Sequence, residues 1–229
     1  DNRRSRGLGD VYKRQNPSGD GGKILVQGTQ RVTASAGSIS DASSGSLGDG
    51  GKVIYFSDDT AVWEPSASIL SEGGTYGGDG GFVETSSKDN LQVSGFVNAA
   101  GGSSSGTWLL DPGNVTISNS ATSGGPDQTG LFRPTANTAN VQISSIISTL
   151  ETDGGNSVII TTDREASTEQ GNITLSADIT VNPATAKLDL MLAAANDITI
   201  NGNIVSSGNA LDVKLHAEGD VTIKSGKNI

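Results

Sequence analysis

Apolar residues along this chain fall in short segments in which they alternate with polar residues. Such alternation is typical of a β-strand with one buried face, because successive side chains of a strand point to opposite sides. Glycine, serine, asparagine and aspartate separate the segments, and these residues favour tight turns. The exception is Ile143–Leu150 (ISSIISTL), whose apolar spacing allows one short helical segment. The pattern therefore predicts many short strands joined by turns, with one short helix.

The strand pattern of the first half repeats with a period near thirty residues. Three copies of Gly-Asp-Gly-Gly, each followed by an apolar segment, begin at Gly19, Gly48 and Gly78, so that their starts are 29 and 30 residues apart. A degenerate fourth copy begins at Gly106. This arrangement is typical of a solenoid, in which each strand pairs with the equivalent strand of the neighbouring rung. A second apolar segment late in each unit keeps the same step and is centred on Ile39, Ile69 and Val97.

Equivalent positions of the repeat should stack in columns. Ile24, Val53 and Val83 would form one interior column, because they follow the glycines at the same distance. We expect the glycine clusters to let the corners adopt positive φ and to keep successive rungs in close register. The residues expected to point outward are Lys23, Lys52, Asp58 and Asp59.

The second half repeats at a shorter period. Leu188–Leu192 and Asn196–Ile200 recur as Leu211–Leu215 and Gly219–Ile223, with equivalent residues 23 apart. An earlier copy within Asn172–Ile179 aligns at an offset of 25. Both halves thus predict stacked strands, although their repeats differ in length.

These patterns divide the chain into four segments. The first looks like a translated sequencing-library adapter joined to a truncated read (SRGLGDVYKRQ), and we expect it to be foreign to the native protein. The second carries repeats of about 30 residues and the fourth carries repeats of about 23. The third is polar and irregular at first, with two prolines, and then contains the expected helix. The four segments are residues 1–15, 16–117, 118–156 and 157–229.

Composition favours a narrow solenoid over a wide globular core. The chain holds 32 glycines, and only 4% of its residues are aromatic. The formal net charge is −10, and residues 1–15 hold five basic and two acidic residues, which leaves −13 for the rest. So acidic a chain would be repelled by nucleic-acid phosphates and anionic lipids. No apolar run approaches the roughly 20 residues that span a bilayer. We therefore expect neither a nucleic-acid partner nor insertion into a membrane.

Three stretches of the first half are specific enough to suggest a family. They are Gly48–Thr60 (GDGGKVIYFSDDT), Gly77–Gly95 (GGDGGFVETSSKDNLQVSG) and Gly106–Ser118 (GTWLLDPGNVTIS). The chain resembles, on these residues, the filamentous haemagglutinin and high-molecular-weight adhesin family, the large exoproteins of two-partner secretion. The resemblance covers residues 19–229. It implies an all-β protein with the fold of a right-handed parallel β-helix. The repeats themselves predict about seven rungs, and the polar stretch with two prolines predicts an irregular excursion near residues 118–140.

The resemblance also implies a function. The chain would be a non-enzymatic shaft segment of a large adhesin, secreted by or displayed on a Gram-negative cell. One partner would be the parent's outer-membrane transporter, which acts through an upstream secretion domain with Asn-Pro-Asn motifs. Asn16-Pro17-Ser18 does not match those motifs, so we expect this segment to lie downstream of that domain. The other partner would be a receptor on a host cell or another surface, for which a carbohydrate is one candidate.

Two other functions remain open, namely the shaft of a contact-dependent toxin and a carbohydrate-active β-helix enzyme. Glycoside cleavage needs two carboxylates about 5–9.5 Å apart. Asp58 and Asp59 are the obvious pair, but we favour a solvated corner for them. Asp189 and Asp212 would form an outward polar row. His216, the single histidine, is favoured as a surface or rung-lining residue over a general base. We therefore expect no catalytic residue.

Neither a metal site nor a cofactor site is expected. Cysteine is absent, which excludes disulfides and thiolate chemistry. Gly73–Phe82 (GGTYGGDGGF) departs from the calcium-binding nonapeptide, with Tyr76 where glycine belongs and Gly81 where an apolar residue belongs. Its glycines are therefore interpreted as turn residues. Trp63 and Trp108 could stack on a sugar, but we favour packing within the rungs.

Two asparagines are weak candidates for glycosylation. Asn114 and Asn172 begin the triplets Asn-Val-Thr and Asn-Ile-Thr, which are formal acceptors. Such triplets arise often by chance in a sequence this rich in threonine.

Overall fold

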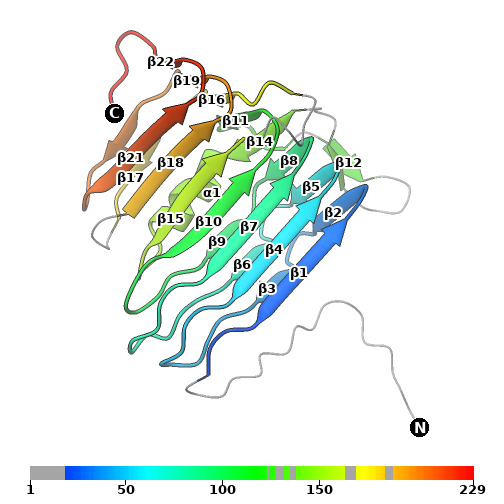
Figure 1. The fold of residues 1–229 in the computed structure, drawn as a ribbon, viewed down its shortest axis with the longest axis vertical. Helices are drawn as coiled ribbons and strands as arrows, with labels where there is room; N and C mark the ends of the chain where they lie inside the picture. Colours follow the sequence, from blue (N-terminus) through cyan, green and yellow to red (C-terminus); the bar gives the residue numbers. More distant parts are fainter. Residues whose placement is uncertain (1–18, 123, 127–131, 135–137, 163–168, 184–187) are drawn as a thin grey trace.

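The chain forms a parallel β-helix, as the repeats predict. The structure, a computed structural model, describes residues 19–122, 124–126, 132–134, 138–162, 169–183 and 188–229. Figure 1 shows its strands stacked side by side along one axis, from the first rung in blue to the last in red. The adapter-like residues 1–15 lie outside the described residues. No described helix is long and apolar enough to cross a membrane.

Sheet A forms the broad face of the coil and contains seven parallel strands, one from each rung. Because the strands keep one register, equivalent side chains stack into columns. The predicted interior column is confirmed, since Ile24 pairs with Val53 and Val53 pairs with Val83. Val53 and Val83 are fully buried, whereas Ile24 is partly buried because β1 is an edge strand. The strands in spatial order are β1 (Lys23–Gly28), β4 (Lys52–Ser57), β7 (Phe82–Ser87), β10 (Gly106–Asp111), β15 (Asn156–Thr161), β18 (Leu188–Ala194) and β21 (Leu211–Ala217).

Sheet B forms a second face and contains eight strands, one more than sheet A. The extra strand, β14, lies between β8 and β11 although it follows both in sequence. The chain therefore leaves one position of the sheet open after β8 and fills it only after the excursion. The strands in spatial order are β2 (Arg31–Ala34), β5 (Thr60–Trp63), β8 (Asn90–Val93), β14 (Ala139–Gln142), β11 (Val115–Ser118), β16 (Ile173–Leu175), β19 (Ile198–Ile200) and β22 (Val221–Ile223).

A third face is made of short strands and the single described helix. The helix α1 (Ile143–Leu150) begins and ends at the predicted residues. It contacts both β9 and β17, so it occupies the interval between the two short sheets of this face. Its apolar side faces the core, and the Thr149 hydroxyl donates to the Val97 carbonyl oxygen at 3.0 Å. The strands are β3 (Ile39–Asp41), β6 (Ser68–Leu70) and β9 (Phe96–Asn98) in one sheet, and β17 (Ile179–Val181) and β20 (Ile204–Ser206) in the other.

The late apolar segments of the repeat are offset by one residue on the first rung of this face. Ile69 and Val97 pair with each other and are buried, but Ser40, not Ile39, is the partner of Ile69. The register set by β1 and β4 has a step of 29 residues, whereas Ile39 and Ile69 are 30 apart. Because a shift of one residue moves a side chain to the opposite face, Ile39 points outward and is 56% exposed.

The excursion between β11 and β14 returns to the coil and covers part of sheet B. It contains an antiparallel hairpin of β12 (Gly124–Pro126) and β13 (Phe132–Pro134), which Figure 1 shows beside the first strands of sheet B. Arg31 donates from Nη1 to the Phe132 carbonyl oxygen at 3.0 Å, and Gln92 donates from Nε2 to the Thr138 carbonyl oxygen at 2.8 Å. Gln92 is consequently buried although it lies on the outer side of β8. The excursion therefore ends where β14 begins at Ala139, close to its expected end near residue 140, and the helix that follows belongs to the coil.

The glycines that precede sheet A are required by close approach between rungs. A Cβ atom on Gly51 would lie 2.0 Å from the carbonyl oxygen of Gly22, and one on Gly50 would lie 2.2 Å from that of Ser71. The prediction of close register is confirmed for these glycines. Positive φ, also predicted for the glycine clusters, occurs at Gly77 beside the third Gly-Asp-Gly-Gly unit and at Gly154 and Gly155 directly before β15, but not at Gly50 or Gly51.

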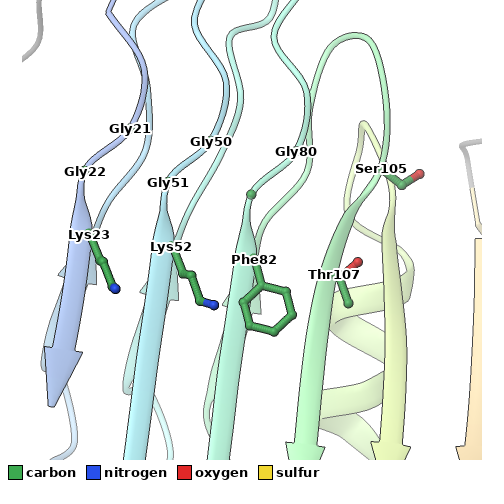
Figure 2. Close-up of a pocket in the computed structure, with 11 residues that line it drawn as sticks. Gly21, Gly22, Lys23, Gly50, Gly51, Lys52, Gly80, Phe82, Ser105 and Thr107 are labelled. Carbon is green, nitrogen blue, oxygen red and sulfur yellow. The ribbon is translucent and has the colours of Figure 1, made fainter.

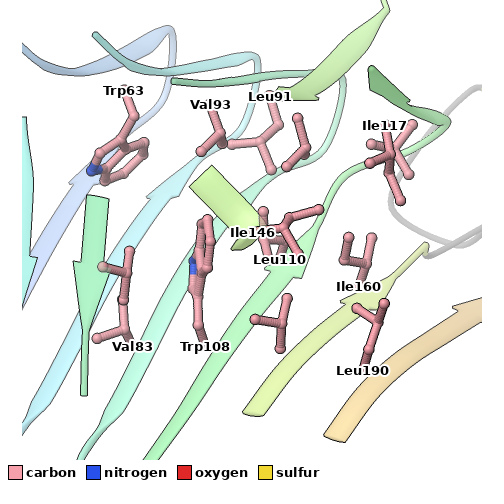
Figure 3. Close-up of a cluster of buried hydrophobic side chains, with 14 of the residues drawn as sticks. Trp63, Val83, Leu91, Val93, Trp108, Leu110, Ile117, Ile146, Ile160 and Leu190 are labelled. Atoms are coloured by element: carbon pink, nitrogen blue, oxygen red, sulfur yellow. The ribbon is translucent and has the colours of Figure 1, made fainter. Parts of the chain in front are cut away.

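The core is a narrow column of aliphatic side chains that holds both tryptophans (Figure 3). Trp63 and Trp108 are at most 1% exposed, which confirms that they pack within the rungs. The Trp108 indole N–H donates to the Thr85 hydroxyl at 3.0 Å. Trp63 meets Tyr55 edge to face, with ring centroids 4.6 Å apart. Neither indole is therefore available to stack on a sugar.

Candidate binding groove

An open groove with a volume of about 570 Å³ lies at the start of sheet A. It crosses the first four strands of the sheet, so it runs along the axis of the coil. Figure 2 shows Lys23, Lys52, Phe82 and Thr107 side by side on these strands. The glycines that line it are Gly21, Gly22, Gly50, Gly51, Gly80 and Gly81.

The repeat itself builds this groove. Each Gly-Gly pair places two residues without side chains at the start of a strand, so the surface is hollow there on three successive rungs. The next residue points outward, because the one after it belongs to the interior column. Lys23 pairs with Lys52, Lys52 with Phe82, and Phe82 with Thr107. One outward side chain therefore borders the groove on each rung.

Two lysines of the groove carry charge that no described carboxylate neutralises. Lys23 and Lys52 are exposed, as predicted, and neither forms an ion pair with a described residue. The Nζ atom of Lys52 lies 4.7 Å from the ring centroid of Phe82, within the range of a cation–π contact. The edge of an acidic protein thus presents a local positive site beside an aromatic ring.

Two lysines outside the groove are paired. Lys88 Nζ lies 2.5 Å from Asp58 Oδ1, and Lys214 Nζ lies 2.6 Å from Asp189 Oδ1. The hydrogen bond to Asp189 and the negative charge of that carboxylate raise the pKa of Lys214 above its ordinary value. These pairs are exposed and stabilise the fold little. They provide matched positions at which charge can be removed without touching the groove.

The carboxylates considered for catalysis have local partners. Asp58 pairs with Lys88, and Asp59 accepts a hydrogen bond at 3.1 Å from the hydroxyl of Thr60. Both lie in the turn between β4 and β5. Each carboxylate thus interacts with its own turn or with the neighbouring rung.

The predicted polar row on the last rungs is present in the structure. Asp189 pairs with Asp212 on successive strands, as expected. His216 lies opposite Ala193 and is exposed at the edge strand β21. In the described part of the chain, no three His, Asp or Glu side chains gather closely enough to hold a metal ion.

The two glycosylation candidates lie in a structural column that sequence reasoning missed. The Asn114 Oδ1 atom accepts from the backbone N–H of Asn172 at 2.7 Å, and Asn172 Oδ1 accepts from that of Asp197 at 3.2 Å. Asp197 Oδ1 accepts in turn from the N–H of Asp220 at 2.8 Å. We call such a column an Asx ladder, because each side chain binds the backbone of the equivalent residue on the next rung.

Two further Asx ladders stand at other corners. In the Gly-Asp-Gly-Gly corner, Asp20 accepts from the N–H of Asp49 and Asp49 from that of Asp79. In the other, Asp178 Oδ1 accepts from the N–H of Asn203 at 2.7 Å, and this hydrogen bond lowers the pKa of Asp178. The signal was present in the sequence as an aspartate or asparagine at the same position of each repeat.

Comparison of the sequence with models of known protein families gives no match, and no functionally curated protein matches it significantly.

Proposed function

We propose that the chain is a shaft segment of a large surface adhesin and has no catalytic activity of its own. The observation that carries this proposal is the continuous stack, in which seven strands of sheet A repeat one register from β1 to β21. A stack of this kind grows in length without changing its cross-section, because each rung contacts only its neighbours. It is therefore suited to hold another part of a protein away from a cell surface. The sequence resemblance to filamentous haemagglutinins supports the same role.

The distribution of carboxylates favours a shaft over a carbohydrate-active enzyme. An enzyme of that class needs a groove with converging acids. The groove of this chain is instead lined by glycine, lysine, phenylalanine and hydroxyl residues. Asp58 and Asp59, the best candidate pair, lie at the opposite end of β4 from the groove.

The shaft of a contact-dependent toxin is the second candidate. The same coil would serve either protein, because the difference lies in the domain that the shaft carries. The structure favours neither, so the adhesin is preferred on the sequence resemblance alone.

The gene on both sides of the encoded segment provides the direct test. We expect further coil repeats, an upstream secretion domain and a neighbouring gene for an outer-membrane transporter. A toxin domain downstream would replace the adhesin with the second candidate. A flanking sequence that encodes a cytoplasmic enzyme would contradict both.

A screen of the purified chain for polysaccharide cleavage tests the non-enzymatic part of the proposal. We expect no cleavage. Reproducible cleavage that Asp58→Asn or Asp59→Asn abolishes would make the chain an enzyme, since either substitution removes a carboxylate and keeps the shape of the turn.

A further inference from the structure

The groove of sheet A points to a ligand. We propose that it binds a linear polysaccharide with one carboxylate on each sugar ring, a polyuronate, which lies along the axis of the coil. The inference rests on the proposed function and deepens it, because it gives the shaft segment itself a class of ligand.

The shape of the groove fits an extended chain. It passes from Gly21 on the first rung to Thr107 on the fourth and is open rather than enclosed. Neighbouring strands lie about 4.8 Å apart, so the outward side chains recur at roughly the length of one sugar unit. A polymer laid along the axis would therefore meet one such side chain for each sugar. A compact small molecule would leave most of the groove empty.

Charge selects an anionic polymer. Lys23 and Lys52 stand on adjacent rungs and have no described carboxylate as a partner. A carboxylate on each of two successive sugars can pair with these two ammonium groups. Each exposed pair contributes little alone, so affinity requires that several contacts form along one ligand.

The next two rungs offer contacts that suit a sugar ring. Phe82 presents an aromatic face beside the lysines, and the apolar C–H face of a sugar can pack on it. Ser105 and Thr107 add hydroxyls that can exchange hydrogen bonds with those of the sugar. Two cationic rungs followed by an aromatic rung and a hydroxyl rung thus match a ligand that is both anionic and rich in hydroxyls.

The surrounding charge excludes a densely charged polymer. Asp20, Asp49 and Asp79 are exposed and stand one residue before the glycines of the groove. A heavily sulfated chain carries more negative charge than two lysines neutralise, and this acidic column would repel the excess. A polyuronate carries only one charge for each sugar.

Calorimetric titration of the full chain with hexagalacturonate tests the proposal. We expect binding that weakens as salt is added, because exposed charges are screened. The double variant Lys23→Gln/Lys52→Gln should bind about tenfold more weakly. Phe82→Leu should also weaken binding, since it keeps apolar bulk but removes the aromatic face. Thermal unfolding of each variant checks that the coil is intact.

The matched control is Lys88→Gln/Lys214→Gln, which removes the same charge at positions outside the groove and should leave binding unchanged. Equal weakening by the two double variants would overturn the proposal, because it would show attraction by net charge alone. Absence of binding, equal binding of the methyl-esterified hexamer, or tighter binding of dextran sulfate would overturn it too. These results concern the groove, whereas the gene sequence tests the shaft, so either idea can fail without the other.

Discussion

At the scale of single residues, the stack depends on two residue types that contribute little apolar surface. Glycine lets backbones approach at the corners, and aspartate or asparagine ties each rung to the next through an Asx ladder. In both cases the contacting atoms belong to the backbone of the neighbouring rung and not to residues nearby in sequence. The same residue type can therefore be essential in the middle of the stack and dispensable at its edge.

Gly22 and Gly51 allow a direct test of close approach, because they occupy equivalent positions on adjacent rungs. A Cβ atom on Gly51 would meet two backbone carbonyl oxygens at 2.0 and 2.5 Å, whereas one on Gly22 meets nothing within 4 Å. We expect Gly51→Ala to lower the free energy of unfolding by about 1–3 kcal/mol. Gly22→Ala should change it by less than about 0.5 kcal/mol. Urea unfolding followed by circular dichroism measures both, and equal effects would contradict the role of the neighbouring rung.

Asp178 allows a test of an Asx ladder through pH. Its hydrogen bonds from Asn203 lower the pKa in the folded state, while the unfolded carboxyl titrates near the ordinary value of 3.8. The carboxylate therefore contributes its stability above that value, and the contribution is lost as the pH falls through the folded pKa.

Asp178→Asn keeps an acceptor oxygen and removes the titration. Because it lacks the charged acceptor, the variant should be less stable than the parent protein near neutral pH, and the difference should shrink as the pH falls below about 3.8. Urea midpoints across the acidic range measure the difference. Parallel acid profiles of the two proteins would show that the ladder is not coupled to pH.

At the scale of elements, α1 and β14 repair an interruption of the coil. The helix occupies the third face between β9 and β17, and β14 fills the open position of sheet B between β8 and β11. Together they keep the core continuous while the excursion covers the outside of the sheet. A rung can therefore carry a long insertion without breaking the stack.

Two adjacent isoleucines of α1 test whether the helix is part of the core. Ile146 is fully buried, and Ile147 is only partly buried. We expect Ile146→Ala to lower the free energy of unfolding by about 2–5 kcal/mol, because it leaves a cavity. Ile147→Ala should have a clearly smaller effect, since the site can relax toward solvent. Denaturant unfolding of the pair measures the contrast, and effects of the same size would place the helix outside the cooperative core.

At the scale of the whole molecule, we expect stability to come from contacts between rungs and not from a bound metal ion. The described acidic residues are distributed along ladders and surface pairs and do not converge on an ion. We therefore predict that millimolar calcium raises the melting temperature by no more than a few degrees, as for weak surface binding. Differential scanning calorimetry with calcium and with a chelator measures this. A larger rise would replace the metal-free shaft with a calcium-stabilised solenoid.

Residues 1–15 should contribute nothing to this stability. Their basic character is opposite to that of the rest, and they match no repeat. A chain without them should keep its free energy of unfolding to within about 1 kcal/mol. A larger loss on deletion would show that the segment belongs to the native protein.

The sequence by itself determined the strands, their order in the first half and the interior column of sheet A. It could do so because alternation fixes which side chains of a strand share a face, and the repeat fixes which residues are equivalent. Ile24, Val53 and Val83 were predicted from these two rules alone, and α1 was predicted from its apolar spacing. Alternation acts within one strand, and the repeat relates equivalent residues of successive units, so both can be followed in the sequence alone.

Only the tertiary structure decided which strands pair across rungs and which surface features form where rungs meet. In sheet B, β14 lies between β8 and β11. No local pattern in the sequence shows whether β8 pairs with β14 or with β11. The outward turn of Ile39 follows from a register that β1 and β4 impose at a distance. The groove likewise exists because three Gly-Gly pairs become neighbours only when the rungs stack. Each of these features depends on contacts across a whole turn of the coil, which become visible only when the chain has folded.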